Sequence, residues 1–290
     1  MRYLTLSPAA ELLPYIDHYW FAEAAAAESS AGTQFPAGGV AMLFNLGPPQ
    51  ALLDAPQGLP TWYDVAWVSG ERARPLYLAS PDGARLVGIA FRPGGARPFF
   101  DRPLSEFTDR VVPLGDVWSR ELLDPVLNRL HTVDAARRDA PGALFRIVEK
   151  ALLLRLEIAR SVGLGLVGAA VRRLAVCGPG ASVRTVAEDL GVSTRYLRRV
   201  FQDTVGLGPK TLHRVLRFRR LIGRIDAADT AADELEPAWS ALSLSCGYFD
   251  QSHMIRDFRL MTGLRPTDYA ARRTPDPNFA HGEESAPATE

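Results

Sequence analysis

Four polar side chains at helical spacing are the residues of this sequence best placed to do chemistry. Arg195, Arg198, Arg199 and Gln202 occupy positions i, i+3, i+4 and i+7, so they share one face of a helix. The residues between them are apolar at complementary positions, which predicts that the opposite face is buried. Guanidinium groups on an exposed helix can pair with guanine O6 and N7 or with phosphate, whereas a solvated charged surface is the plain alternative.

A weak internal repeat places this helix in a larger pattern. The segment "STRYLRRVFQDTVGLGP", from Ser193, aligns with "DQSHMIRDFRLMTGLRP", from Asp250, with five of 17 positions identical. Each copy follows a short apolar helix and a glycine, Gly191 or Gly247, which predicts a tight turn between two helices. Ser193 and Asp250 are residue types that cap helix N-termini. The repeat therefore predicts two helix-turn-helix units, each with an exposed second helix.

The second copy carries a different set of polar side chains at the start and on the outer side of its second helix. A glutamine can bind adenine through two hydrogen bonds, and serine, histidine or arginine can bind a base edge or a phosphate. The candidate DNA-binding residues of the two copies are Arg195, Arg198, Arg199, Gln202, Gln251, Ser252, His253 and Arg256.

The segment that joins the two copies, "PKTLHRVLRFRRLIGRI", has the apolar period of one long helix. Such a helix can hold two recognition helices about 34 Å apart, the distance between successive major grooves on one side of a duplex. Basic side chains near the DNA backbone attract phosphate in a salt-dependent way. The candidates for phosphate contact are Lys210, Arg217, Arg220 and Arg259, with Arg214, Arg219 and Arg224 close by in the sequence.

Charge is distributed unevenly along a chain whose formal net charge is zero. Residues 170–224 hold 12 Lys+Arg and 3 Asp+Glu, a net charge of +9, which is typical of a segment that binds an anion such as nucleic acid. Residues 274–290 are acidic and rich in proline, which predicts a disordered tail. Residues 226–237 hold five acidic side chains, and we expect them to loosen the second unit or weaken its hold on DNA.

The first 115 residues follow a different pattern. Short apolar runs such as "GGVAMLFNLG" and "RLVGIAFRPGG", bounded by glycine and proline, predict strands. We interpret residues 38–95 as an antiparallel sheet that forms a barrel or a sandwich, with a hairpin turn at residues 80–83. The predicted fold class is α+β, with an N-terminal β domain (1–115), a helical linker (116–165), an all-α domain of two helix-turn-helix units (166–273) and the tail (274–290).

The doubled motif resembles the DNA-binding domain of AraC/XylS-type transcriptional regulators. The resemblance lies in "VAEDLGVSTRYLRRVFQDTVGLGPKTL" and "CGYFDQSHMIRDFRLMTGLRPTDY". It implies base contacts on the outer face of each second helix. The segments "VAMLFNLG" and "LVGIAFRPGGARPFF" resemble the sensor region that precedes such domains, which implies a cupin-like β domain that binds a small effector or dimerises.

These features together predict a sequence-specific regulator of transcription that binds double-stranded promoter or operator DNA. A small effector at the N-terminal domain is expected to control it, and RNA polymerase and a second copy of the chain are compatible further partners. Two alternatives remain open at this point. One is a cupin-type enzyme with an accessory DNA-binding domain, and the other is a non-specific architectural DNA-binding protein.

Other classes of function find little support in the residues. His18 is the only histidine among the first 130 residues, so we expect no metal site, no cofactor and no catalytic residue set. Cys177 and Cys246 are expected to be small buried residues rather than a disulfide framework. No segment has the apolar length of a membrane helix, and the N-terminus has no secretory pattern, so we expect a soluble cytoplasmic protein.

Overall fold

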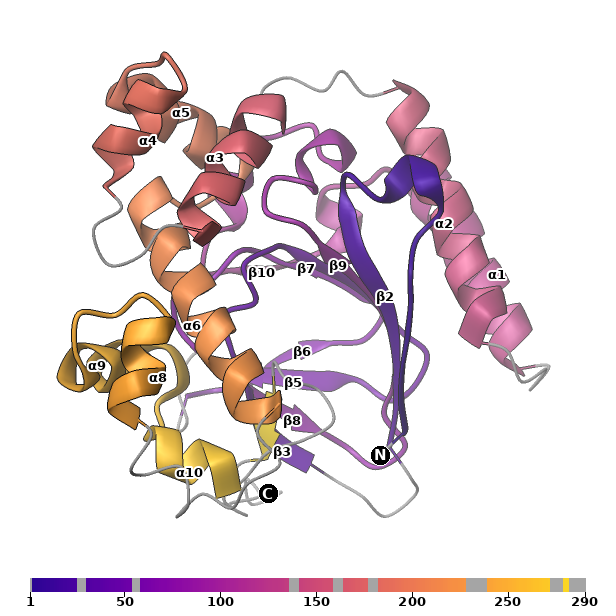
Figure 1. The fold of residues 1–290 in the computed structure, drawn as a ribbon. Coiled ribbons are helices and arrows are strands. Elements are labelled where there is room, and N and C mark those ends of the chain that lie inside the picture. Colours follow the sequence, from indigo (N-terminus) through magenta and orange to yellow (C-terminus); the bar gives the residue numbers. More distant parts are fainter. Residues whose placement is uncertain are drawn as a thin grey trace.

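The N-terminal part of the chain, together with one strand from near the C-terminus, forms two antiparallel sheets that share an apolar core (Figure 1). The six-stranded sheet consists, in spatial order, of β1 (Arg2–Leu6), β2 (Ile16–Glu23), β9 (Arg85–Phe91), β4 (Ala41–Asn45), β7 (Ala66–Ser69) and β10 (Val111–Pro113). The five-stranded sheet consists of β11 (Phe279–His281), β3 (Ser30–Gln34), β8 (Leu76–Ser80), β5 (Gln50–Leu53) and β6 (Thr61–Tyr63). The structure, a computed structural model, describes residues 2–24, 30–53, 58–135, 141–158, 164–176, 182–227, 239–271 and 279–281.

Apolar side chains from both sheets hold the sandwich together. Leu43 and Trp67 of the six-stranded sheet pack there with Leu76 of the five-stranded sheet. Because side chains alternate along a strand, Phe44 points to the other face of the six-stranded sheet and joins a larger core. Two helices of the predicted linker contribute to that core, and they are α1 (Arg120–Ala135) and α2 (Pro141–Ile158). Four short 3₁₀ helices also lie among the described residues of the N-terminal part: η1 (Ala10–Leu12), η2 (Arg97–Phe99), η3 (Leu104–Phe107) and η4 (Leu114–Asp116).

The architecture corrects two details of the sequence-based prediction. The sheets form a sandwich, one of the two forms expected, but they extend beyond residues 38–95, since β1, β2 and β3 precede that range and β10 and β11 follow it. Residues 80–83 do make a turn, with Gly83 at φ +72°, but the strands on either side of it belong to different sheets. A turn sequence fixes a local reversal of the chain, whereas distant partners decide which sheet each strand joins, so the predicted hairpin is wrong.

The C-terminal part is helical and lies on one side of the sandwich (Figure 1). Helix α6 runs between a group of helices near its start and a second group near its end. The helices of this part are α3 (Leu164–Val176), α4 (Val183–Asp189), α5 (Thr194–Thr204), α6 (Pro209–Ala227), α8 (Trp239–Ser245), α9 (Gln251–Thr262) and α10 (Pro266–Ala271).

One aromatic residue of the N-terminal part belongs to the core of these helices. Phe35 follows β3 directly, yet its ring lies 6.2 Å from that of Phe218 in α6 and 5.6 Å from that of Tyr269 in α10. It is 3% exposed. The two parts of the chain therefore share a core rather than meeting only at their surfaces.

The acidic tail is not wholly without structure, which corrects the prediction of a disordered segment. Phe279–His281 form β11, which pairs with β3 as an antiparallel edge strand. The strand returns the chain from the second helical group to the N-terminal sandwich. The rest of the tail and residues 228–237 of the acidic segment lie outside the described residues, as does Cys177.

Candidate nucleic-acid interface

The first predicted helix-turn-helix unit corresponds to α4 and α5. Ser182 caps α4 by accepting a hydrogen bond from the Thr185 backbone N–H at 3.0 Å. Gly191 turns the chain at φ +65°, and Ser193 then caps α5 by accepting from the Tyr196 N–H at 3.1 Å. Helix α5 buries Leu197 and Phe201 against the unit's core. The Ser193 cap and the Gly191 turn are those that the sequence predicts, so local signals fix the start of α5.

The outer face of α5 carries the polar residues expected there. Arg195, Arg198, Arg199 and Gln202 are all exposed. The guanidinium of Arg199 lies 5.2 Å from the ring centre of Tyr196, which stabilises its direction through a cation–π contact. Three neighbouring cations repel one another in the absence of a partner, and a polyanion in front of this face would relieve that repulsion.

The second unit corresponds to α8 and α9. Gly247 turns the chain at φ +87°, and the Asp250 carboxylate caps α9 by accepting from the His253 N–H at 2.7 Å. Ser252 and Arg256 are exposed on α9. Gln251 is half-buried and accepts a hydrogen bond from Ser240 of α8 at 3.1 Å, so its amide is partly engaged inside the unit.

A stripe of four arginines on α6 faces the second unit and forms the seam between the two. Arg214, Arg217, Arg220 and Arg224 recur every three or four residues and so share one helix face. Arg220 donates to the Cys246 carbonyl at 3.4 Å, and Arg224 donates to the Ser245 hydroxyl at 3.1 Å. The stripe therefore joins α6 to the second unit.

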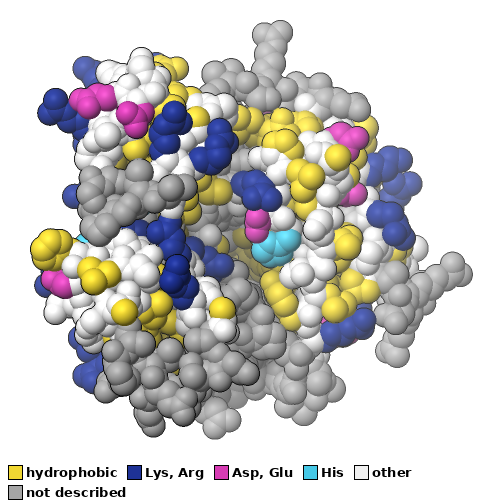
Figure 2. All heavy atoms as spheres, in the orientation of Figure 1, with side chains coloured by type: hydrophobic (Ala, Val, Ile, Leu, Met, Phe, Trp, Pro, Cys, Tyr) yellow, Lys and Arg dark blue, Asp and Glu magenta, His cyan; other side chains and the backbone are white. Residues whose placement is uncertain are grey.

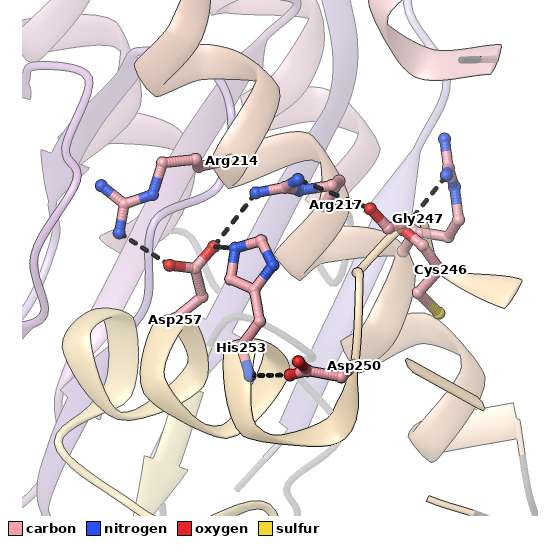
Figure 3. A network of polar contacts seen from close by, with 8 residues as sticks. Arg214, Arg217, Cys246, Gly247, Asp250, His253 and Asp257 are labelled. Atoms are coloured by element: carbon pink, nitrogen blue, oxygen red, sulfur yellow. Dashed lines mark hydrogen bonds and ion pairs between the residues drawn. The ribbon is translucent and has the colours of Figure 1, made fainter. Parts of the chain in front are cut away.

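The centre of this seam is the buried carboxylate of Asp257 on α9 (Figure 3). It accepts from Arg214 at 2.9 Å and from Arg217 at 3.2 Å, and its side chain is 6% exposed. His253 lies edge-on to Tyr248, with its Nε2 3.7 Å from Asp257. His253 therefore points toward the seam, although part of its ring remains at the surface.

These contacts show which of the predicted phosphate-binding residues already have partners within the protein. The side chain of Arg217 is 11% exposed and also donates to the Gly247 carbonyl at 3.4 Å. A guanidinium that is mostly buried and hydrogen-bonded in this way stabilises the fold. Arg220 is half-buried and donates to the Cys246 carbonyl. Lys210 and Arg259 are exposed and stay candidates for phosphate contact. Sequence reasoning missed Asp257, although an acid at a position flanked by Met254 and Phe258 on the inner face was a signal for a buried ion pair.

His213 of α6 is a buried titratable group beside this stripe. Burial, and then the nearby charges of Arg217 and Arg220, lower the pKa of His213 to about 4. Its Nε2 is buried and accepts no hydrogen bond among the described residues. His213 is therefore neutral near pH 7 and takes no part in attracting DNA.

Residues 186–272 match a family described as a helix-turn-helix domain. The C-terminal part of this chain is therefore a helix-turn-helix domain. The match spans both units and the helix between them, in agreement with the resemblance seen in the sequence. Residues 4–113 match a domain of unknown function (DUF6597), which covers the sandwich. No curated protein matches the chain.

Several solved structures are similar to this chain at low identity. Two structures of ToxT from Vibrio cholerae are each 9% identical. One covers 87% of this chain and 95% of its own with a TM-score of 0.48, and the other covers 93% and 98% with 0.49. The C-terminal domain of AraT, a response regulator from Geobacillus stearothermophilus, is 20% identical. It covers 37% of this chain and 84% of its own, with a TM-score of 0.31.

The described residues also bear on metal binding and membrane insertion. No group of three or more His, Cys, Asp or Glu side chains is placed there to hold a metal ion. No helix among them has the length and apolar character needed to cross a membrane.

Proposed function

We propose that this protein regulates transcription by binding specific DNA sequences through its helix-turn-helix domain. The observation that carries the proposal is the exposed face of α5, with Arg195, Arg198, Arg199 and Gln202 on the second helix of a capped helix-turn-helix unit. A helix with such a face fits the major groove, where arginine and glutamine bind base edges directly.

The arrangement of the two units supports binding to one side of a duplex. They are joined by α6, whose 19 residues span about 28 Å at 1.5 Å per residue. The second unit packs along this helix through Arg214 and Arg217, so α6 holds both units in a fixed relation, as binding to successive major grooves on one face of DNA requires. We therefore assign base contacts in a second groove to Ser252 and Arg256. Gln251 and His253 are less available for such contacts, because their side chains already have partners within the protein.

A cavity between the two parts of the chain supports control by a small molecule. It is open, has a volume of about 710 Å³, and is lined by Tyr15 and Arg92 on the N-terminal side and by Val171 and Arg172 of α3. Figure 2 shows that the surface is hollowed between the two halves of the molecule. A ligand there would contact both parts at once and so bias their relative position.

The test of DNA binding begins with the full-length protein and sheared genomic DNA at near-physiological salt. Sequencing of the bound fragments should show strong enrichment at a few sites. Uniform recovery of all sequences would contradict specific regulation and support an architectural role. Failure to recover any DNA with or without candidate effectors would contradict the proposal as a whole.

The recovered site then tests the α5 face directly. Arg199→Ala should weaken specific binding by about 5- to 150-fold, the loss expected when one base contact worth about 1–3 kcal/mol is removed. The matched control is Arg184→Ala on α4, which removes the same charge from a side chain that is 81% exposed and paired with Glu188. Equal binding by the two variants would remove Arg199 from the contact set.

A further inference from the structure

The turn between α8 and α9 leaves one large aromatic side chain in solvent. Cys246, Gly247 and Tyr248 are buried, but the next residue, Phe249, is 77% exposed. Full burial of a phenylalanine is worth about 1.5–3 kcal/mol, so a phenylalanine kept in water forgoes most of that stabilisation. No ring contact of Phe249 occurs among the described residues. The side chain therefore contributes little to the folded domain.

The backbone that presents Phe249 is held firmly in place (Figure 3). Arg217 donates to the Gly247 carbonyl and Arg220 to the Cys246 carbonyl, each at 3.4 Å. The guanidinium of Arg217 also lies 5.0 Å from the ring centre of Tyr248, and Gly247 has the positive φ that the turn needs. On its other side, Phe249 is followed by Asp250, the N-cap of α9. Two anchored residues thus flank the exposed ring.

The position of Phe249 relative to α9 indicates what the ring meets. The N-terminal residues of a recognition helix contact base edges in the major groove. Phe249 lies three residues before Ser252 and immediately before the helix, at the same end. The apolar group that DNA exposes in the major groove is the C5-methyl group of thymine, which phenylalanine contacts favourably. An exposed ring at this place is complementary to that methyl group, whereas phosphate would favour a cation.

We propose that Phe249 is a specificity-determining residue that contacts a thymine methyl group in the half-site bound by α9. The proposal rests on the DNA-binding function proposed above and adds a base preference to it. It also connects the arginine stripe of α6 with base recognition, because Arg217 and Arg220 fix the turn that carries the ring. The methyl contact needs no charge, so it is independent of the salt-dependent attraction of the α5 face.

The experiment uses the full-length protein and a duplex containing the most enriched genomic site. Each thymine is replaced in turn by uracil, which lacks only the methyl group. Wild-type protein should bind about fourfold more weakly when the contacted methyl is absent, since one buried methyl group is worth a factor of about four. Phe249→Ala should show at least this loss on the thymine duplex and no further loss on the uracil duplex at that position.

The control variant is Leu59→Ala, which removes an apolar side chain that is 93% exposed in the N-terminal part. It should bind both duplexes as the wild type does. Three results would overturn the proposal. In the first, Phe249→Ala binds the thymine duplex like the wild type, which would leave a protein partner as the occupant of this surface. In the second, Phe249→Ala weakens binding but keeps the wild-type sensitivity to uracil, and in the third the wild-type protein is sensitive to no methyl group near α9. If the wild-type protein binds no DNA in the first place, the proposed function fails instead.

Discussion

Arginines of this chain have at least two roles that depend on their surroundings rather than on their type. Arg195, Arg198 and Arg199 are exposed on α5 and are free to meet a polyanion. Arg217 instead shares the buried Asp257 with Arg214. A buried ion pair adds little net stability, but removing one partner leaves an uncompensated charge and is costly. The two groups should therefore respond very differently to the same substitution.

Substitution of Arg217 tests this division. Arg217→Ala leaves Asp257 with one arginine and removes the bond to Gly247, so the free energy of unfolding should fall by about 2–4 kcal/mol. Lys210→Ala, at an exposed position, should change it by less than about 0.5 kcal/mol. Urea unfolding of both variants measures the difference. Equal unfolding midpoints, together with a flatter salt dependence of DNA binding in Arg217→Ala, would return Arg217 to the phosphate contacts.

At the scale of elements, the helices follow from local sequence and the sheets do not. The caps Ser193 and Asp250 and the glycine turns fix α5 and α9, because each signal lies within a few residues of the structure it predicts. The sandwich depends on distant pairings, such as β2 with β9, which no local pattern encodes. The arginine stripe of α6 was also ambiguous, since a stripe at helical spacing looks the same on a DNA-facing surface and in a packed seam.

Helix α6 should make the stability of the protein sensitive to acid through His213. The pKa of His213 is lowered from 6.5 to about 4 by burial and by neighbouring arginines, so the unfolded chain takes up a proton first as pH falls. The contribution of neutral His213 to the free energy of unfolding is complete above pH 6.5. It is lost as the pH falls from about 6.5 to 4, and the loss is at most about 3 kcal/mol.

The comparison that isolates this effect is His213→Gln, which has no titrating group at this position. Wild-type protein should lose more stability than the variant when urea unfolding is repeated at pH 7.0, 5.5 and 4.5. Parallel pH profiles for the two proteins would mean that His213 does not supply the acid sensitivity.

At the scale of the whole molecule, the sandwich holds both helix-turn-helix units. The first unit is joined to it by the Thr108 hydroxyl, which donates to the Gly206 carbonyl at 2.7 Å, and by the Arg97–Asp203 ion pair at 3.2 Å. Gly206 has φ +95°, and a Cβ there would lie 2.9 Å from the Leu104 carbonyl oxygen, so the approach requires glycine. Phe35, which directly follows β3 of the sandwich, packs against Phe218 of α6 and Tyr269 of α10, the helices on either side of the second unit in the sequence. A change in either contact would alter the relation between the two units.

The coupling between the sandwich and the helical part can be measured most directly at Phe35. Phe35→Ala removes a ring packed between α6 and α10 and should lower the free energy of unfolding by about 3–5 kcal/mol. Because the ring lies in the helical core, amide hydrogen exchange should accelerate in α6 and α10. The matched control, Phe44→Ala, removes the same side chain from the core under α1 and α2, so exchange should accelerate first in β4 and β9. Exchange in Phe35→Ala that accelerated only beside β3 would mean that the two parts are stable independently. An effector bound to the sandwich could then not act on α6 and α10 through this contact.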